Sequence, residues 1–343
     1  ISISTITIQA RDDTNTVYTT GGNSVVLSEN GSAIIGPITD VGDGTYSATM
    51  TNTTAESITV SGTISSIGIT DTAAVNFTPG DATAAQTTIS TSQSILTADG
   101  SSTTVITVQT KDAQGNNLTS GGNTIVLAEN GSAIISEITD VGDGTYTATI
   151  SNTVAEEITV NGSLNGTSIT DTAAVTFIPG TVSITQSTIE VSSSPITADG
   201  TTSATITVQA KDSQGNDLNS GGVAVTLSEN GSALISGVTD NGNGTYTASI
   251  TNTTAESITI SALLGATPLT DTAAISFIAG PAASSQTTIS STPTTVTAEC
   301  SSVSTITVQT IDNKRNNQSH GRSTKSLREN SNRQLELIQD KRN

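Results

Sequence analysis

The stretch DVGDGTYTATI, residues 140–150, joins a turn rich in Gly and Asp to a run that alternates with a period of two. Glycine tolerates positive φ, and aspartate bonds its own backbone two residues on, so the first half is typical of a tight connection between strands. In the second half, Tyr146, Ala148 and Ile150 alternate with threonines. The pattern predicts a strand with Tyr146 on its core face and Thr147 on its solvent face.

This stretch recurs at residues 40–50 and 240–250, and further landmarks keep the same step of 100 residues. They are Gln9, Gln109, Gln209 and Gln309; Phe77, Phe177 and Phe277; and the Glu-Asn-Gly triplets that begin at Glu29, Glu129 and Glu229. About 100 residues suffice for one domain with its own core. We therefore expect repeats at 1–80, which lacks its N-terminal strand, at 81–180 and at 181–280, followed by an incomplete, degenerate fourth repeat at 281–343.

Seven short alternating segments, separated by turn signals, make up one repeat. They cover residues 104–110, 123–128, 133–138, 145–150, 157–162 and 168–177, with a first strand near 188–196 of the following unit. Thr, Ser, Ala, Ile and Val dominate the composition and aromatic residues make up 2% of it, which favours strands with β-branched cores over helices. Together these features predict an all-β chain of seven-stranded, immunoglobulin-like β-sandwiches.

The connectors between repeats are short and contain Pro and Gly: Pro79-Gly80, Pro179-Gly180 and Gly280-Pro281. Connectors of this length are too short to behave as free coils. We therefore expect the sandwiches to be arranged as a semi-rigid rod.

Charge argues against several classes of partner. The formal net charge is −19, and residues 1–300 contain 26 acidic side chains against three basic ones, Arg11, Lys111 and Lys211. Lys and Arg supply most nonspecific affinity for phosphate backbones and anionic lipid, so we expect no nucleic-acid partner. No apolar run approaches the roughly 20 residues of a membrane helix, so we expect no direct membrane insertion in this segment. Because Ile1 falls in mid-repeat, we expect a fragment of a longer precursor.

Three longer stretches, read in order, carry a family resemblance: ADGTTSATITVQAKDSQGNDL at 198–218, DNGNGTYTASI at 240–250 and TDTAAISF at 270–277. The chain resembles the bacterial immunoglobulin-like repeats of the invasin and intimin adhesins, especially the invasin domain 3 type, over nearly all of residues 1–310. The resemblance implies Greek-key sandwiches displayed on Gram-negative bacteria and stacked as a stalk beneath a binding tip. No outer-membrane barrel and no lectin-like tip accompanies them in this sequence.

The turn aspartates are candidate calcium ligands, because Ca²⁺ takes six to eight oxygen ligands. The candidates are Asp40, Asp43, Asp140 and Asp143. In the third repeat Asn243 replaces the second carboxylate, which suits an Asx turn as well as Asp does but removes charge from a metal site. The turn is therefore the preferred interpretation, and the expectation is of no metal and no cofactor.

Catalysis has little support in the sequence. Asp99 with Asp112, and Asp199 with Asp212, are interpreted as solvated loop carboxylates near a domain end. Cys300 and His320 are the single cysteine and the single histidine, so neither a disulfide nor a nucleophile and base pair is expected. We expect a protein that is not an enzyme.

The tail after Lys314 keeps parts of the repeat register, while Arg, Lys and Gln occupy many core positions. A decayed or mis-framed repeat fits better than a basic patch for membrane or nucleic acid. We expect disorder there, or at most a short helix over 326–338.

The function expected is an extracellular stalk or spacer of a bacterial surface adhesin. Its partners would be neighbouring repeats of the same chain, with a host-cell or cell-surface ligand met through tip domains and an outer-membrane anchor supplied by regions absent here. Two alternatives stay open: a binding module that itself contacts a ligand on a host or neighbouring cell, or a cell-envelope, filamin-like scaffold. Binding surfaces usually need exposed aromatic or Arg anchors, and the sandwiches have almost none beyond Tyr18, which only the first repeat possesses. This and the near identity of the repeats favour the spacer.

Overall fold

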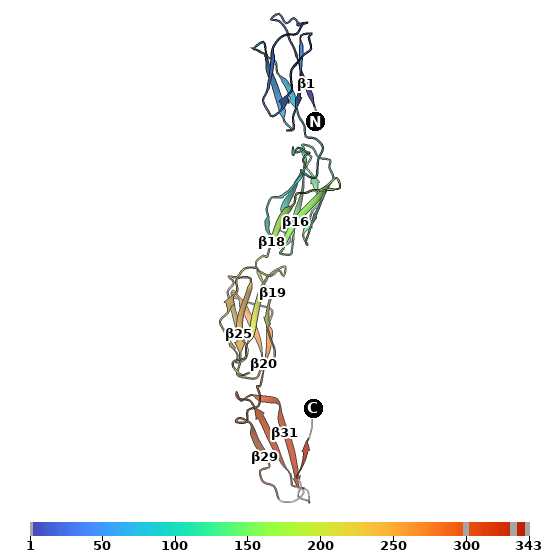
Figure 1. The fold of residues 1–343 in the computed structure, drawn as a ribbon. Helices are drawn as coiled ribbons and strands as arrows, with labels where there is room; N and C mark the ends of the chain where they lie inside the picture. Colours follow the sequence, from blue (N-terminus) through green and yellow to red (C-terminus); the bar gives the residue numbers. More distant parts are fainter. Residues whose placement is uncertain (1–2, 298–301, 330–334, 340–343) are drawn as a thin grey trace. The chain divides into compact units, whose positions relative to one another are not determined.

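The computed structural model describes residues 3–297, 302–329 and 335–339, and every regular element in those ranges is a β-strand (Figure 1). Within the same ranges there is no helix of the length and apolarity needed to cross a membrane. The chain divides into two compact units, 1–178 and 179–343. The expected all-β fold class is confirmed.

The second repeat, in the first unit, shows the complete architecture. One sheet has the order β13-β15-β11-β9, with β14 paired to β15; the other has the order β10-β18-β16-β12, with β17 paired to β16. The first sheet contains β9 (Thr88–Thr91), β11 (Thr104–Gln109), β13 (Ile134–Ile135), β14 (Thr139–Asp140) and β15 (Thr145–Ser151). The second contains β10 (Ile95–Thr97), β12 (Ile125–Glu129), β16 (Glu157–Leu164), β17 (Thr167–Ser168) and β18 (Ala173–Ile178).

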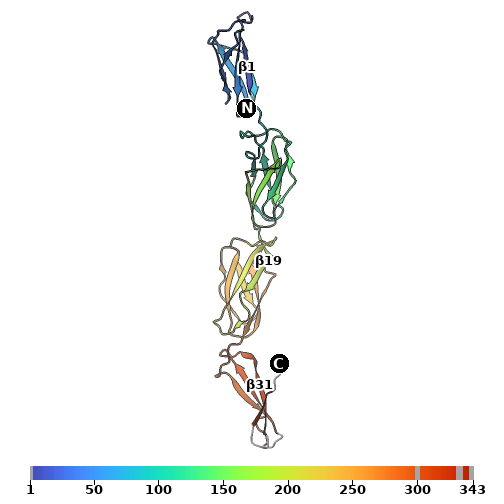
Figure 2. The same ribbon diagram turned by 45° about the vertical axis from the view of Figure 1, so that its right-hand side comes forward.

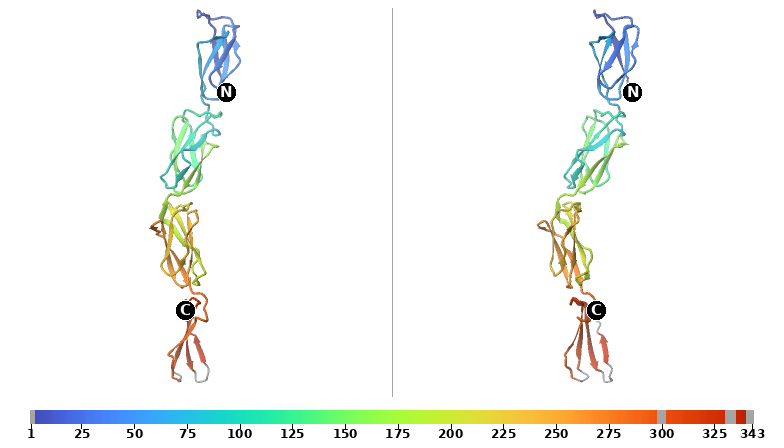
Figure 3. Two further views of the ribbon diagram at one scale, coloured as in Figure 1. Left: turned by 90° about the vertical axis from the view of Figure 1, so that its left-hand side faces the viewer. Right: turned by 60° about the vertical axis from the view of Figure 1, so that its left-hand side comes forward.

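The third repeat, in the second unit, has the same two sheets, which Figure 2 and Figure 3 show from other sides. Its first sheet contains β19 (Val182–Val191), β21 (Ala204–Asp212), β23 (Leu234–Ile235), β24 (Thr239–Asp240) and β25 (Thr245–Thr251). Its second contains β20 (Ile196–Thr197), β22 (Val225–Glu229), β26 (Ser257–Leu264), β27 (Thr267–Pro268) and β28 (Ala273–Ile278).

The core of each sandwich lies between its sheets and is lined by the residues that alternation placed inward. Ile106, Val108 and Ile150 are fully buried, and Tyr146 is 2% exposed. Val126, predicted for the wetter face, is exposed. The predicted inward parity of these strands is confirmed.

Two segments that the alternating pattern predicts as single strands each form two strands in the structure. The expected strand 168–177 becomes β17 and β18, and the carboxylate of Asp171 between them accepts a hydrogen bond from the backbone N–H of Ile89 at 2.9 Å. The expected strand 188–196 ends as β19, and the chain then crosses to the other sheet as β20. A strand that changes sheets must break its ladder, which a period-two pattern does not record.

The first repeat contains β1 (Ser4–Gln9), β3 (Ile34–Ile35), β4 (Thr39–Asp40) and β5 (Thr45–Thr51) in one sheet. The other sheet contains β2 (Val25–Glu29), β6 (Ser57–Ile64), β7 (Ile67–Gly68) and β8 (Ala73–Asn76). β1 pairs with β5 as β11 pairs with β15 in the second repeat.

From Asn317 on, the described residues of the tail lie in strands, where the sequence led us to expect disorder or at most a short helix over 326–338. Together with the two strands before Lys314 they form one sheet of β29 (Thr288–Thr292), β30 (Ser304–Ile311), β31 (Asn317–Glu329) and β32 (Leu335–Gln339) in that order. A strand edge exposes backbone N–H and C=O groups that can pair with another segment. At the edge of β30 these groups pair with β31, and this pairing outweighs the weak local preference of that segment. Part of the tail for which disorder was expected, residues 330–334 and 340–343, lies outside the described residues. Cys300 also lies outside them.

Candidate functional site

The four candidate calcium ligands lie in turns, where their carboxylates accept hydrogen bonds from the surrounding backbone. Asp140 Oδ2 accepts from the N–H of Gly122 at 2.7 Å and Oδ1 from that of Gly142 at 2.9 Å. Asp143 Oδ1 accepts from the N–H and the hydroxyl of Thr145 at 3.0 and 2.5 Å. Asp40 and Asp43 make the same bonds in the first repeat.

The turn accepts an amide in place of a carboxylate. In the third repeat Asn243 Oδ1 accepts from the N–H and the hydroxyl of Thr245 at 3.1 and 2.7 Å. The hydroxyl of Thr145, and then its backbone N–H, lower the pKa of Asp143. Within the described parts of the chain, no three His, Cys, Asp or Glu side chains gather so as to hold a metal ion. The geometry is that of an Asx turn that serves the hairpin.

Asp112 and Asp212 are not the solvated loop carboxylates that the sequence suggested. They are 2% and 1% exposed, whereas Asp99 is half-buried and accepts from the backbone N–H groups of Ser101 and Ser102. Asp112 is buried because the connector between the first two repeats and the turn at 112–116 both fold over its carboxylate.

Asp112 gathers four hydrogen bonds at the joint between the first and second repeats. Its carboxylate accepts from the backbone N–H of Gly80 in the connector and from those of Gln114 and Asn116, each at 2.9 Å, and from Asn116 Nδ2 at 2.8 Å. Burial by itself raises the pKa of Asp112, but the bonds from Asn116, Gly80 and Gln114 outweigh it and lower the pKa to about 2. The carboxylate is therefore ionised and ties the connector to the second repeat.

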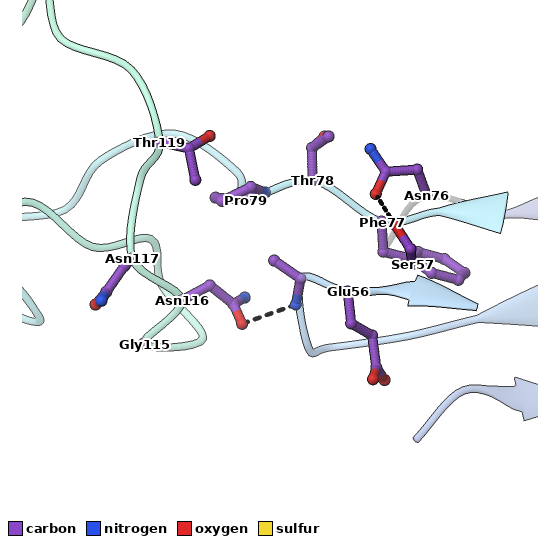
Figure 4. A pocket seen from close by; sticks show the side chains of 11 residues that line it. Glu56, Ser57, Asn76, Phe77, Thr78, Pro79, Gly115, Asn116, Asn117 and Thr119 are labelled. Carbon is purple, nitrogen blue, oxygen red and sulfur yellow. Dashed lines mark hydrogen bonds between the residues drawn. The ribbon is translucent and has the colours of Figure 1, made fainter. Parts of the chain in front are cut away.

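The side chain of Asn116 forms hydrogen bonds to the backbone of the first repeat (Figure 4). Its Nδ2 donates to the carbonyl of Thr53 at 2.9 Å, and its Oδ1 accepts from the N–H of Ala55 at 2.9 Å. The pair recurs in the second unit, where Asp312 accepts from the N–H of Gly280 at 2.9 Å, while Asn316 donates to the carbonyl of Thr253 at 2.9 Å. Asn316 also accepts from the N–H of Ala255 at 2.7 Å.

A shallow groove of about 500 Å³ lies beside this joint in the first unit and is lined by Ala55, Glu56, Ser57, Asn76, Phe77, Thr78, Pro79, Gly115, Asn116, Asn117 and Thr119. Glu56 is the one titratable group in that lining. Its carboxylate accepts from Ser32 and from Asn52, and the hydroxyl of Ser32 is the main cause that lowers its pKa. A groove with one bonded carboxylate offers no acid and base pair.

The sequence analysis did not predict the pairing of Asp112 with Asn116, or of Asp312 with Asn316, at the joints between repeats. The signal was an Asp followed four residues later by an Asn at 112–116, 212–216 and 312–316, directly after a buried strand. In the first repeat the later position is Thr16. What the pattern did not show was that other segments cover these side chains.

The family model for invasin, domain 3, matches the chain three times, over residues 2–80, 83–180 and 183–280. The chain belongs to the invasin domain 3 family. Its complete sandwiches are thus immunoglobulin-like repeats of a bacterial cell-surface adhesin, as the resemblance implied.

Three solved structures are similar to these invasin-type repeats at 20–24% sequence identity. FdeC, an Escherichia coli adhesin, is 23% identical, with 81% of this chain and 92% of that chain covered and a TM-score of 0.49. Invasin, a bacterial integrin-binding protein, is 20% identical, with coverages of 92% and 77% and a TM-score of 0.48. InvD of Yersinia pseudotuberculosis is 24% identical, with coverages of 68% and 72% and a TM-score of 0.46.

Proposed function

We propose that these repeats are the spacer of the adhesin and hold a binding tip away from the outer membrane. The observation that carries the proposal is the joint, where Asp112 ties the connector to one repeat and Asn116 reaches the backbone of the repeat before it. A flexible linker does not require side-chain hydrogen bonds to the adjoining domains, whereas a spacer benefits from them, because its reach depends on fixed angles between units.

On this proposal the repeats are bounded at 1–80, 81–180, 181–280 and 281–343 and stand in series as a semi-rigid rod. Strands of about 8 residues at roughly 3.3 Å each make a sandwich near 26 Å long before loops, so three in series should reach on the order of 100 Å or more. Small-angle scattering should show an elongated particle. A compact particle would contradict the rod.

The outer-membrane anchor and the contact with a host cell belong, on the same proposal, to other regions of the adhesin. We also propose that the repeats have no catalytic activity, which the lining of the groove supports: its one carboxylate, that of Glu56, is already hydrogen-bonded.

The spacer is tested by deleting residues 81–180 from the full-length surface protein. Display on the cell should persist, and the height of a labelled tip above the membrane should fall. Insertion of an unrelated rigid sandwich of the same length should restore that height. Saturable binding of host cells by residues 1–343 alone, abolished by substitutions in one loop, would replace the spacer with the binding-module alternative.

A further inference from the structure

The side-chain amide of Asn116 makes three hydrogen bonds at the joint and uses both of its donor hydrogens. A side-chain amide has two donor hydrogens and one oxygen that accepts. One donor meets Asp112 Oδ2 at 2.8 Å in the second repeat, while the other donor and the oxygen meet Thr53 and Ala55 in the first. The amide group is thus held by both repeats, by Asp112 of its own repeat and by the backbone of the repeat before it.

The loop that receives Asn116 is itself braced. Asn52 Oδ1 accepts from the N–H of Thr54 at 3.0 Å, and Asn52 Nδ2 donates to Glu56 at 2.8 Å. Glu56 in turn accepts from the backbone N–H of Ser32 at 2.8 Å. Because this loop is held in place by hydrogen bonds, a contact to it can fix the orientation of the second repeat relative to the first. A contact to a loose loop could not.

In the first repeat the same turn forms with Thr16 in place of the asparagine. Asp12 Oδ1 accepts from the N–H groups of Thr14 and Thr16 at 2.9 and 2.8 Å, as Asp112 does from Gln114 and Asn116. The turn therefore forms with threonine at its fifth position. A threonine hydroxyl is too short to bond both Thr53 and Ala55 at the distances that the amide spans.

We propose that Asn116 and Asn316 are positioning residues that fix the angle between consecutive repeats, and that threonine at this position leaves the turn folded but the joint free to bend. The connector alone gives one attachment between two domains, about which they can swing, and the asparagine adds a second attachment that stops the swing. The biological meaning of this inference rests on the proposed spacer function.

The test uses the full chain with Cys300 replaced by serine and spin labels on cysteines at the exposed, equivalent positions Ala74 and Ala174. Pulsed electron resonance measures the distribution of distances between the labels. Asn116→Thr should broaden that distribution at least about twofold, because relative motion is the default for domains without a large apolar interface. The matched control is Asn117→Thr, whose side chain is exposed, and it should leave the width unchanged.

The melting temperature separates a loose joint from a damaged repeat. It should fall only slightly in Asn116→Thr, since the turn keeps its backbone bonds to Asp112 and loses only the bond from the amide, and the distance distribution should nevertheless broaden. If Asn116→Thr proves unstable, Asn316→Thr with labels at Ala274 and Ser290 tests the second joint in the same way. Equal widths for the native chain and the asparagine variants would overturn the inference, even if the deletion experiment upholds the spacer. Broadening together with an unchanged tip height would instead reject the spacer and keep the joint.

Discussion

Tyr146 combines a buried ring with a satisfied polar end. The side chain is 2% exposed, and its hydroxyl oxygen accepts from the N–H of Asn123 at 2.8 Å. Tyr146→Ala should therefore lower the free energy of unfolding of its repeat by about 3–5 kcal/mol, since the surrounding core relaxes only partly into the cavity. Thr147→Ala on the opposite face should change it little. Denaturant midpoints measure both, and equal effects would mean that the inward face is misassigned.

The acid stability of the second repeat should depend on Asp112. Its pKa in the folded state, about 2, lies below the ordinary value of 3.8. The stability contributed by the ionised group is therefore present above about pH 4 and lost as the pH falls toward 2. Asp112→Asn should destabilise the repeat at pH 7 by about 1–3 kcal/mol, because buried donors lose a charged acceptor.

Melting temperatures between pH 7 and pH 2 test this dependence. The native repeat should lose more stability across that range than Asp112→Asn does. Parallel pH profiles for the two proteins would show that the carboxylate contributes nothing to the acid sensitivity.

The turn before β15 places two neighbouring glycines in different surroundings. Gly142 and Gly144 have φ of +90° and +88°, but a Cβ on Gly142 would meet nothing within 4 Å, whereas one on Gly144 would lie 2.1 Å from the carbonyl oxygen of Leu118. Gly142→Ala should cost about 1 kcal/mol for the left-handed conformation alone. Gly144→Ala should cost at least about twice as much, because overpacking adds to that strain. Thermal unfolding of the two variants gives the comparison, and similar costs would argue against the close approach.

Calcium should matter little to these turns. Asp143→Asn should leave stability nearly unchanged, because Asn243 makes the equivalent bonds in the third repeat. Millimolar calcium should likewise leave the melting temperature of the native chain almost the same. A rise of many degrees, lost in Asp143→Asn, would establish a metal site at this turn.

Each complete repeat should fold without its neighbours. The second repeat has two sheets and its own core, in which Ile106, Val160 and Val175 are fully buried. Residues 81–180 expressed alone should therefore give the circular dichroism of a β-protein and a cooperative unfolding transition. An unfolded chain or a helical spectrum would contradict the proposed boundaries.

The sequence by itself determined the features that depend on near neighbours along the chain. The inward side of β11 and β15 and the turn made by Asp143 follow from residues within a few positions of one another. The step of 100 residues follows from comparing the sequence with itself. A strand turns successive side chains to opposite faces whatever lies around it, and an Asx turn closes on its own backbone. Such features can be predicted without knowing the rest of the fold.

Tertiary structure alone decided the burial of polar groups and the pairing of strands. Asp112 is buried by a connector 32 residues before it, and Asn116 bonds a loop 61 to 63 residues before it. In the tail, β31 pairs with β30 as a strand where the sequence predicted disorder or at most a short helix. A carboxylate in a loop looks the same in sequence whether water or another segment covers it, because its environment is set by contacts with residues distant along the chain.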